Sequence, residues 1–193
     1  IRKRADPMKR ISHRVVLSGV AASTLALAAC GNGIGSNGGN NIDSRVSATL
    51  SYLDQTYPGT RDLKEKSVGM LVMPLITEAS FGFGGSYGRG ALQVNDITVD
   101  YYSASQASVG IQIGAQQYAH VLYFMTEEAL AEFRASSGWA VGADVEYALN
   151  DRGANLSAES TTVLAPVIAV VFGQAGLLAG ASVEGTKYQR IIP

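Results

Sequence analysis

A serine flanked by glycines, Ser86, lies in the stretch of this sequence that has the spacing of a hydrolase nucleophile. The stretch Gly84–Gly88 satisfies the pattern G-x-S-x-G, in which the serine occupies a sharp turn between a strand and a helix. Here further glycine and a predicted strand follow the serine. His120 would have to serve as the base, and an acid after it would give the wrong chain order. We therefore interpret the stretch as a glycine-rich turn or bulged strand, and a serine acyl hydrolase as the weaker alternative.

The other residues capable of acid–base or metal chemistry do not form a recognisable site. His120 lies among apolar residues of a predicted strand, where a lone histidine is more often a hydrogen-bonded structural residue. Glu127 and Glu128 fall in the first turn of a predicted helix, where carboxylates favour the positive helix end, and Glu132 is expected to be solvated. One histidine and one cysteine after residue 29 exclude a zinc or iron site of the usual kind. We predict no catalytic residue, no metal and no cofactor.

Five basic residues are candidates for contact with a lipid headgroup. Six of the 15 Lys and Arg residues but only one of the 16 Asp and Glu residues precede Cys30, which leaves an acidic domain after it. Nucleic acid would repel such a domain, so binding to an anionic membrane requires a local basic patch or an apolar pocket. The candidates are Arg45, Arg61, Lys64, Lys66 and Arg89. Ordinary surface ion pairing is the alternative for the residues near the first helices. Arg89 lies among glycines, where backbone N–H groups and a guanidinium could receive a phosphate.

The segment before Cys30 has the order of a secretory signal. Basic residues between Lys9 and Arg14 precede an apolar run over 15–29, and small residues lead into Cys30. This order resembles the lipobox of bacterial lipoproteins, which implies that Cys30 is acylated and becomes the mature N-terminus. A transmembrane helix is the alternative, but the run falls short of the ~20 residues that a bilayer core requires.

These features divide the chain into four segments. Residues 1–7, upstream of a natural start at Met8, are expected to be a remnant foreign to the natural protein. Residues 8–29 are the predicted signal peptide, and 30–42 are the acylated cysteine with a flexible linker rich in glycine and asparagine. Residues 43–193 have the length of one domain.

Hydrophobic periodicity predicts helices at the start and in the middle of this domain. A first helix is expected to begin at a capping Asp43 or Ser44, and a short charged helix follows Thr60. A later helix is expected after the cap Thr126, with a buried stripe formed by Leu130 and Phe133 and an end at Gly138.

The remaining pattern predicts short strands. They are expected over 68–73 with a stop at Pro74, over 81–90 as a turn or bulged strand, and over 91–94, 97–102, 109–114, 118–125 and 139–149. A final hairpin-like pair, 163–172 and 177–183, is expected around a turn at 173–176. Glycines inside strands mark tight bends or close backbone approach. We predict an α+β domain with a strongly curved antiparallel sheet, whose closure into a barrel stays open.

Four motifs in order resemble the SYLF domain family. They are 68–74 followed by the glycine cluster 84–90, then 108–116, the helix containing Leu130 and Phe133, and 176–185. The resemblance covers roughly residue 43 to the C-terminus and implies lipid binding without catalysis. Eukaryotic members bind phosphoinositides, with an N-terminal amphipathic helix implicated, and fungal members also bind actin. Where members usually carry a Trp and a Pro, this sequence reads Ile97 to Ser105, with Tyr101 or Tyr102 in place of the Trp.

The resemblance and the signal together predict a lipoprotein of the bacterial cell envelope. Its domain is expected to bind phospholipid or phosphoinositide-type headgroups without catalysis, with a phospholipid membrane as partner. The alternative is an envelope scaffold that binds another protein and contacts lipid through acylation alone. Gly31, in place of an aspartate after the acylated residue, resembles outer-membrane sorting. The expected location is therefore the outer membrane, facing the periplasm.

Overall fold

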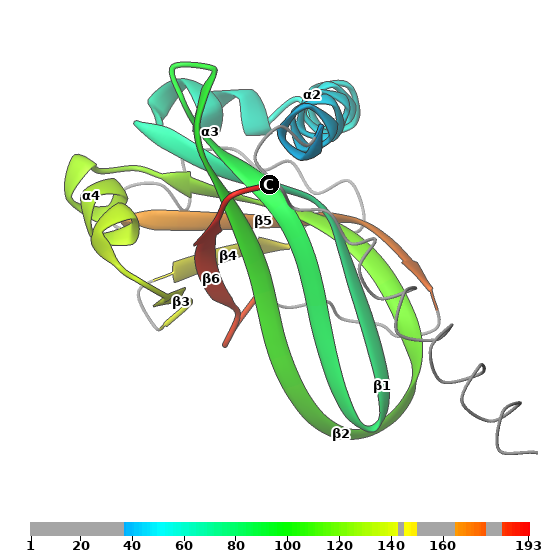
Figure 1. Cartoon of the computed structure of the whole chain (residues 1–193). Coiled ribbons are helices and arrows are strands. Elements are labelled where there is room, and N and C mark those ends of the chain that lie inside the picture. Colours follow the sequence, from blue (N-terminus) through cyan, green and yellow to red (C-terminus); the bar gives the residue numbers. More distant parts are fainter. Residues whose placement is uncertain (1–36, 143–144, 150–164, 177–182) are drawn as a thin grey trace, which may run out of the picture. The chain divides into compact units, whose positions relative to one another are not determined.

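The computed structural model describes residues 37–142, 145–149, 165–176 and 183–193 of the chain. They lie in one compact unit, Asn37–Pro193, in which helices and a curved sheet surround two hydrophobic clusters (Figure 1). The prediction of an α+β fold with a strongly curved sheet is confirmed. Because this unit contains its own core, we expect it to fold independently. The predicted signal peptide, Cys30 and the linker up to Ser36 lie outside the described residues.

A long antiparallel hairpin dominates the sheet. Strand β1 spans Gly69–Val94 and pairs along its length with β2, Ile97–Phe124. The two residues between them, Asn95 and Asp96, have φ angles of 52° and 61°, as the common two-residue hairpin turn requires. The prediction of several short strands is therefore wrong over this region. Pro74 does not end its strand, because the register with β2 shifts between Met73 and Ile76 and accommodates a residue that lacks an N–H donor.

The hairpin is bent in its middle and folds back on itself (Figure 1). A register shift between Phe81 and Phe83 lies at this bend, so the glycine-dense stretch 81–90 is the bulged strand of the two alternatives. Gly88 and Gly90 allow the two halves of β1 to approach closely. A Cβ atom at Gly88 would overlap the Leu75 carbonyl oxygen, and one at Gly90 would overlap that of Val72.

Four further strands in the described part of the chain complete the sheet. The first half of β2 pairs with β6, Lys187–Ile191, which in turn pairs with β3, Trp139–Ala140. The second half of β2 pairs with β5, Val167–Gly176, and β5 pairs in parallel with β4, Val145–Leu149. The predicted turn at 173–176 is wrong, because these residues continue β5 and Gly176 pairs with Gln116. The predicted strand 139–149 is divided into β3 and β4, and the parallel pair departs from an all-antiparallel sheet.

Two helices cover one face of the sheet. Helix α2 spans Gly38–Thr56 and α3 spans Thr60–Lys66. Their buried side chains, among them Val46, Leu53 and Leu63, pack against Val72 and other buried residues on this face of the sheet. The first helix begins at Gly38, so the predicted flexible linker is wrong over 38–42, and Asp43 lies inside α2 instead of at its N-cap. Among the described residues, no helix combines the length and the apolar character that crossing a bilayer demands.

The opposite face of the sheet encloses the second cluster. Helix α4, Glu127–Ala135, begins as predicted, with the Thr126 hydroxyl accepting a hydrogen bond from the Ala129 N–H at 3.2 Å. Leu130 and Phe133 are buried as predicted. Tyr102 lies in this cluster with its ring centroid 4.7 Å from that of Phe133. Of the two tyrosines expected to replace a Trp, Tyr102 is therefore the one in the core.

Candidate functional site

Two of the predicted lipid-contact residues, Arg45 and Arg89, line one pocket. The pocket has a volume of about 390 Å³ and lies between α2 and both halves of β1. We call it the Arg45–Arg89 pocket, and its lining residues are Asn41, Ile42, Arg45, Leu75, Thr77, Tyr87, Gly88 and Arg89. On α2 a spacing of four residues places Asn41 and Arg45 on the same helix face. On β1 a spacing of two residues places Tyr87 and Arg89 on one face of the strand.

The position of Arg45 depends on a polar contact that fixes α2 to the hairpin. Both carboxylate oxygens of Asp43 accept hydrogen bonds from β2, one from Thr98 Oγ1 at 3.0 Å and one from Tyr101 Oη at 2.8 Å. Burial, followed by the hydrogen bond and the negative charge of Asp43, raises the pKa of Tyr101, so the phenol stays a proton donor. Asp43 is thus satisfied by β2 and is not part of the pocket lining.

The charge of the Arg45–Arg89 pocket is positive. Its lining contains two arginines and no carboxylate. The ion pairs of the described residues use Lys64, Arg134 and Arg190, and none of them uses Arg45 or Arg89. Two exposed guanidiniums with polar neighbours can bind a phosphate group, because their N–H groups match its oxygens in pairs.

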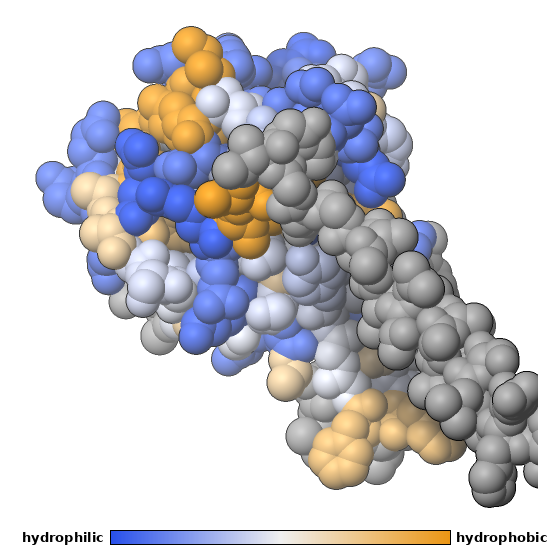
Figure 2. Space-filling view, viewed as in Figure 1, coloured by the Kyte–Doolittle hydropathy of each residue, from blue (hydrophilic) through white to orange (hydrophobic). Residues whose placement is uncertain are grey.

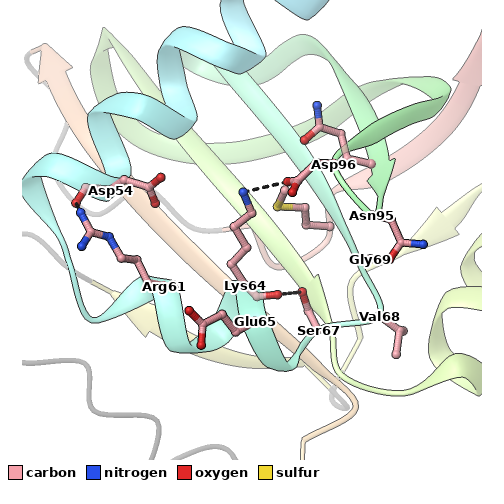
Figure 3. A pocket seen from close by; sticks show the side chains of 11 residues that line it. Asp54, Arg61, Lys64, Glu65, Ser67, Val68, Gly69, Asn95 and Asp96 are labelled. Atoms are coloured by element: carbon pink, nitrogen blue, oxygen red, sulfur yellow. Dashed lines mark hydrogen bonds and ion pairs between the residues drawn. The ribbon is translucent and has the colours of Figure 1, made fainter.

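A second pocket contains Arg61 and Lys64, but their charges are already compensated. This pocket, of about 410 Å³, lies beside α3 and is also lined by the carboxylates of Asp54, Glu65 and Asp96. Lys64 Nζ lies 2.7 Å from Asp96 Oδ1, and Figure 3 shows the lysine directed at that carboxylate. The Arg61 guanidinium donates to the Asp54 carbonyl oxygen at 2.8 Å. With more acids than bases, this pocket is a poor site for an anion.

The structure therefore separates the five candidates into three groups. Arg45 and Arg89 share a pocket, Arg61 and Lys64 share another, and Lys66 is exposed at the end of α3 and lines neither. For Lys64 the alternative of surface ion pairing is the one observed, although its partner is Asp96 of the hairpin turn. Sequence reasoning missed Asn41, Thr77 and Tyr87 as neighbours of the arginines. The strand alternation of Tyr87 with Arg89 was the available signal for one of them.

The hydrolase pattern is not supported by its structural context. Ser86 lies inside β1 and is followed by more strand, whereas a nucleophile elbow requires a helix there. Its hydroxyl lies 3.5 Å from Gln106 Oε1. His120 is completely buried, and its Nε2 is hydrogen-bonded to Tyr188 Oη at 2.7 Å. Burial lowers the pKa of His120 to about 3. Among the described residues, no group of His, Cys, Asp and Glu side chains could hold a metal ion.

Part of the chain is similar to a known protein family. Residues 105–190 match the model of the Ysc84 family, described as Las17-binding protein actin regulator. No curated protein matches the chain. The matched segment begins within β2 and includes α4 and β5, whereas every residue of the Arg45–Arg89 pocket precedes it.

Proposed function

We propose that this chain is a membrane-anchored, non-catalytic protein of the Ysc84 (SYLF) family that binds anionic lipid headgroups. The match of residues 105–190 to that family model supports a domain for binding lipid or another partner. The observation that carries the proposal is the Arg45–Arg89 pocket, which has two arginines and no carboxylate in its lining. The lipid anchor is the acyl group predicted on Cys30.

The chemistry of the pocket fits a phosphate-containing headgroup. Arg45 and Arg89 provide charge-assisted hydrogen bonds to phosphate oxygens, and Asn41, Thr77 and Tyr87 add neutral donors around them. A volume of about 390 Å³ lies in the range of small-molecule sites. The pocket is therefore large enough for a phosphate and its substituent, and phosphatidylglycerol and phosphoinositides both belong to this class.

The predicted anchor would keep this pocket close to a bilayer. From Cys30 to Gly38, the first residue of α2, the chain can span at most about 28 Å in any conformation. Asn41 and Ile42, in the first turns of α2, already line the pocket. An acyl group on Cys30 would thus hold the arginines within reach of headgroups. Tethering raises the effective concentration of the site, so weak recognition of each headgroup suffices.

The proposed location is the outer membrane of a bacterial envelope, with the domain on the periplasmic side. Gly31 after the acylated residue supports this sorting. A scaffold role is the second candidate, because the matched family is described by its binding to another protein. In that case the acyl group would be the only lipid contact and the arginines would be dispensable for vesicle binding.

Vesicle flotation with residues 37–193, which lack Cys30, tests the headgroup site separately from the anchor. We expect binding to phosphatidylcholine vesicles that contain phosphatidylglycerol. A double variant, Arg45→Gln with Arg89→Gln, should bind about thirtyfold more weakly, at about 1 kcal/mol for each cation near an anionic surface. The matched control, Lys66→Gln with Lys187→Gln, removes two exposed cations outside the pocket.

The two variants and a competitor distinguish a specific headgroup site from general charge attraction and from binding of a free phosphate compound. Equal losses in the pocket variant and the control would contradict a specific site and leave only general charge attraction. Competition by inorganic phosphate or glycerol phosphate as strong as by vesicles would identify a free phosphate compound, not a headgroup, as the ligand. Vesicle binding unchanged by the pocket variant would reject the proposal.

A further inference from the structure

Two phenylalanines are exposed at the bend of the β1–β2 hairpin. Phe81 is 79% and Phe83 is 81% exposed, whereas the other three phenylalanines of the chain are at most 2% exposed. Figure 2 shows an apolar surface at this end of the molecule, over the bend that Figure 1 places at the bottom of the view. In the register of the hairpin, Phe81 lies opposite Ile113 and Phe83 opposite Val109. The bend is therefore apolar in sequence on both strands.

Such a bend is unusual in a domain that buries its other three phenylalanines. Single exposed apolar residues are common and need no explanation, but two neighbouring phenylalanines at the end of a projecting hairpin lose the free energy that burial would provide. An exposed apolar surface of this kind marks a site of interaction with protein or membrane.

We propose that this bend inserts into the bilayer beside the headgroup that the Arg45–Arg89 pocket binds, an inference that rests on the proposed function. The occupant is a bilayer because the same two strand halves carry the cationic pocket. Thr77 and Tyr87 line the pocket and lie four residues from Phe81 and Phe83, respectively, which is about 13 Å along each half of β1. An anionic surface with an apolar interior complements both features.

The dimensions of a membrane fit this arrangement. The headgroup layer is about 5–7 Å thick on each side of the hydrocarbon core. A hairpin inclined to the surface, with its axis about 30° from the membrane plane, converts 13 Å of strand into about 6 Å of depth. The phenylalanines then reach the acyl chains while the arginines stay with the phosphates. Tyr87, which is 55% exposed, lies along β1 between Phe83 and Arg89. It would therefore be at the membrane–water interface, where amphipathic aromatic rings are favoured.

A second copy of this chain fits the bend less well. A symmetric contact through this face would bring the arginine pairs of two copies together without a carboxylate in either pocket lining. Like charges placed together disfavour such an interface.

The test uses residues 37–193 with a thiol introduced at the bend. Because Cys30 is the only cysteine of the chain and lies outside this fragment, Phe83→Cys can be labelled at one position with an environment-sensitive fluorophore. We expect the label to gain fluorescence with phosphatidylglycerol-containing vesicles and to be quenched by lipids that carry a shallow spin label. The matched control is Ile97→Cys, since Ile97 is 66% exposed next to the hairpin turn, at the opposite end of the hairpin.

A double variant adds a measurement of affinity. Phe81→Ser with Phe83→Ser should weaken vesicle binding about a hundredfold, and this loss should persist at high salt because it comes from lost apolar burial. Ile97→Ser with Val99→Ser, a second exposed apolar pair, should leave binding unchanged. Far-ultraviolet circular dichroism of each variant confirms that it is folded.

The outcomes separate this inference from the proposed function. If Phe81→Ser with Phe83→Ser binds like the unsubstituted fragment and the label at residue 83 stays in water, insertion is overturned while loss in the arginine variant still supports the headgroup site. The reverse pattern supports insertion and rejects the headgroup site. Insertion would be overturned in favour of self-association by two results together. The label would not be quenched by the lipids, and the fragment would form a dimer that is absent from the variant Phe81→Ser with Phe83→Ser.

Discussion

Acidic pH should lower the free energy of unfolding of this domain because of one buried histidine. His120 is completely buried in β2, and its Nε2 lies 2.7 Å from Tyr188 Oη. Its Nδ1 has no hydrogen-bond partner among the described residues. A protonated ring has two N–H donors and a positive charge. This buried environment offers a hydrogen-bond partner at only one ring nitrogen and does not solvate the charge. Burial accordingly lowers the pKa of His120 to about 3.

The size of the effect follows from the difference in pKa between the folded and unfolded chain. In the unfolded chain the histidine titrates near its ordinary pKa of about 6.5. Between pH 6.5 and pH 3 the unfolded state therefore binds a proton that the folded state does not, and the free energy of unfolding falls as the pH falls. At pH 5 the difference of about 1.5 pH units corresponds to a loss of about 2 kcal/mol.

Urea unfolding of residues 37–193 at about pH 7.5 and about pH 5 measures this loss. The fragment has a single histidine. His120→Gln provides the comparison, because glutamine can retain a hydrogen bond to Tyr188 and does not titrate. We expect the fragment to lose about 2 kcal/mol more than the variant between the two pH values, while the carboxylates contribute equally to both. Equal pH dependence in the two proteins would refute the assignment of the acid sensitivity to His120.

Two further predictions concern the elements that shape the fold. Gly90→Ala should reduce the free energy of unfolding by about 3 kcal/mol, because the new methyl group meets the Val72 carbonyl oxygen inside the folded hairpin. Gly142→Ala, where a Cβ meets nothing within 4 Å, should change it little, and similar urea midpoints for the two variants would contradict close packing at Gly90. Thr126→Ala should cost about 1 kcal/mol by removing the cap of α4. Thermal unfolding measures this change, and an unaltered midpoint would show that the cap contributes nothing.

Local signals were sufficient for some elements of this fold. Helix α4 follows from its cap at Thr126 and the apolar spacing of Leu130 and Phe133, all within one short segment. The apolar pattern also located much of β1 and β2, and interior glycines predicted the curvature of the sheet. These features depend on neighbours in sequence or on a residue type with one dominant structural use, so they can be predicted without knowledge of the partner strands.

Continuity of the strands could not be predicted from the same signals. Pro74 and the glycines at 173–176 are typical strand breakers, yet β1 and β5 continue through them because β2 supplies a partner along both. Strand β6 was missed because its five residues have little apolar alternation and become a strand only by pairing with β2 and β3. Cross-strand pairing is a tertiary effect and overrides local preference.

Both arginines of the candidate site were named from the sequence, but the pocket that they share was not predicted. The sequence indicated that an acidic domain needs a local group of cations, and it proposed both Arg45 and Arg89. It gave no reason to join them, because one lies on α2 and the other on β1 in separate parts of the sequence. Their proximity arises only when the hairpin folds back on itself and Asp43 fixes α2 to Thr98 and Tyr101.

The overall negative charge of the domain is compatible with this local cationic site and helps to orient it. Asp96 is paired with Lys64, and Asp100 lies within 3.5 Å of Arg134 and Arg190, so these charges are compensated by cations outside the Arg45–Arg89 pocket. At physiological ionic strength, charges more than about 8 Å apart are largely screened from one another. Distant carboxylates therefore would not cancel the proposed attraction of the pocket for an anionic headgroup, but they would repel an anionic membrane wherever they approached it. Under the proposed function, the two effects together favour contact with the bilayer through the Arg45–Arg89 pocket and the bend beside it.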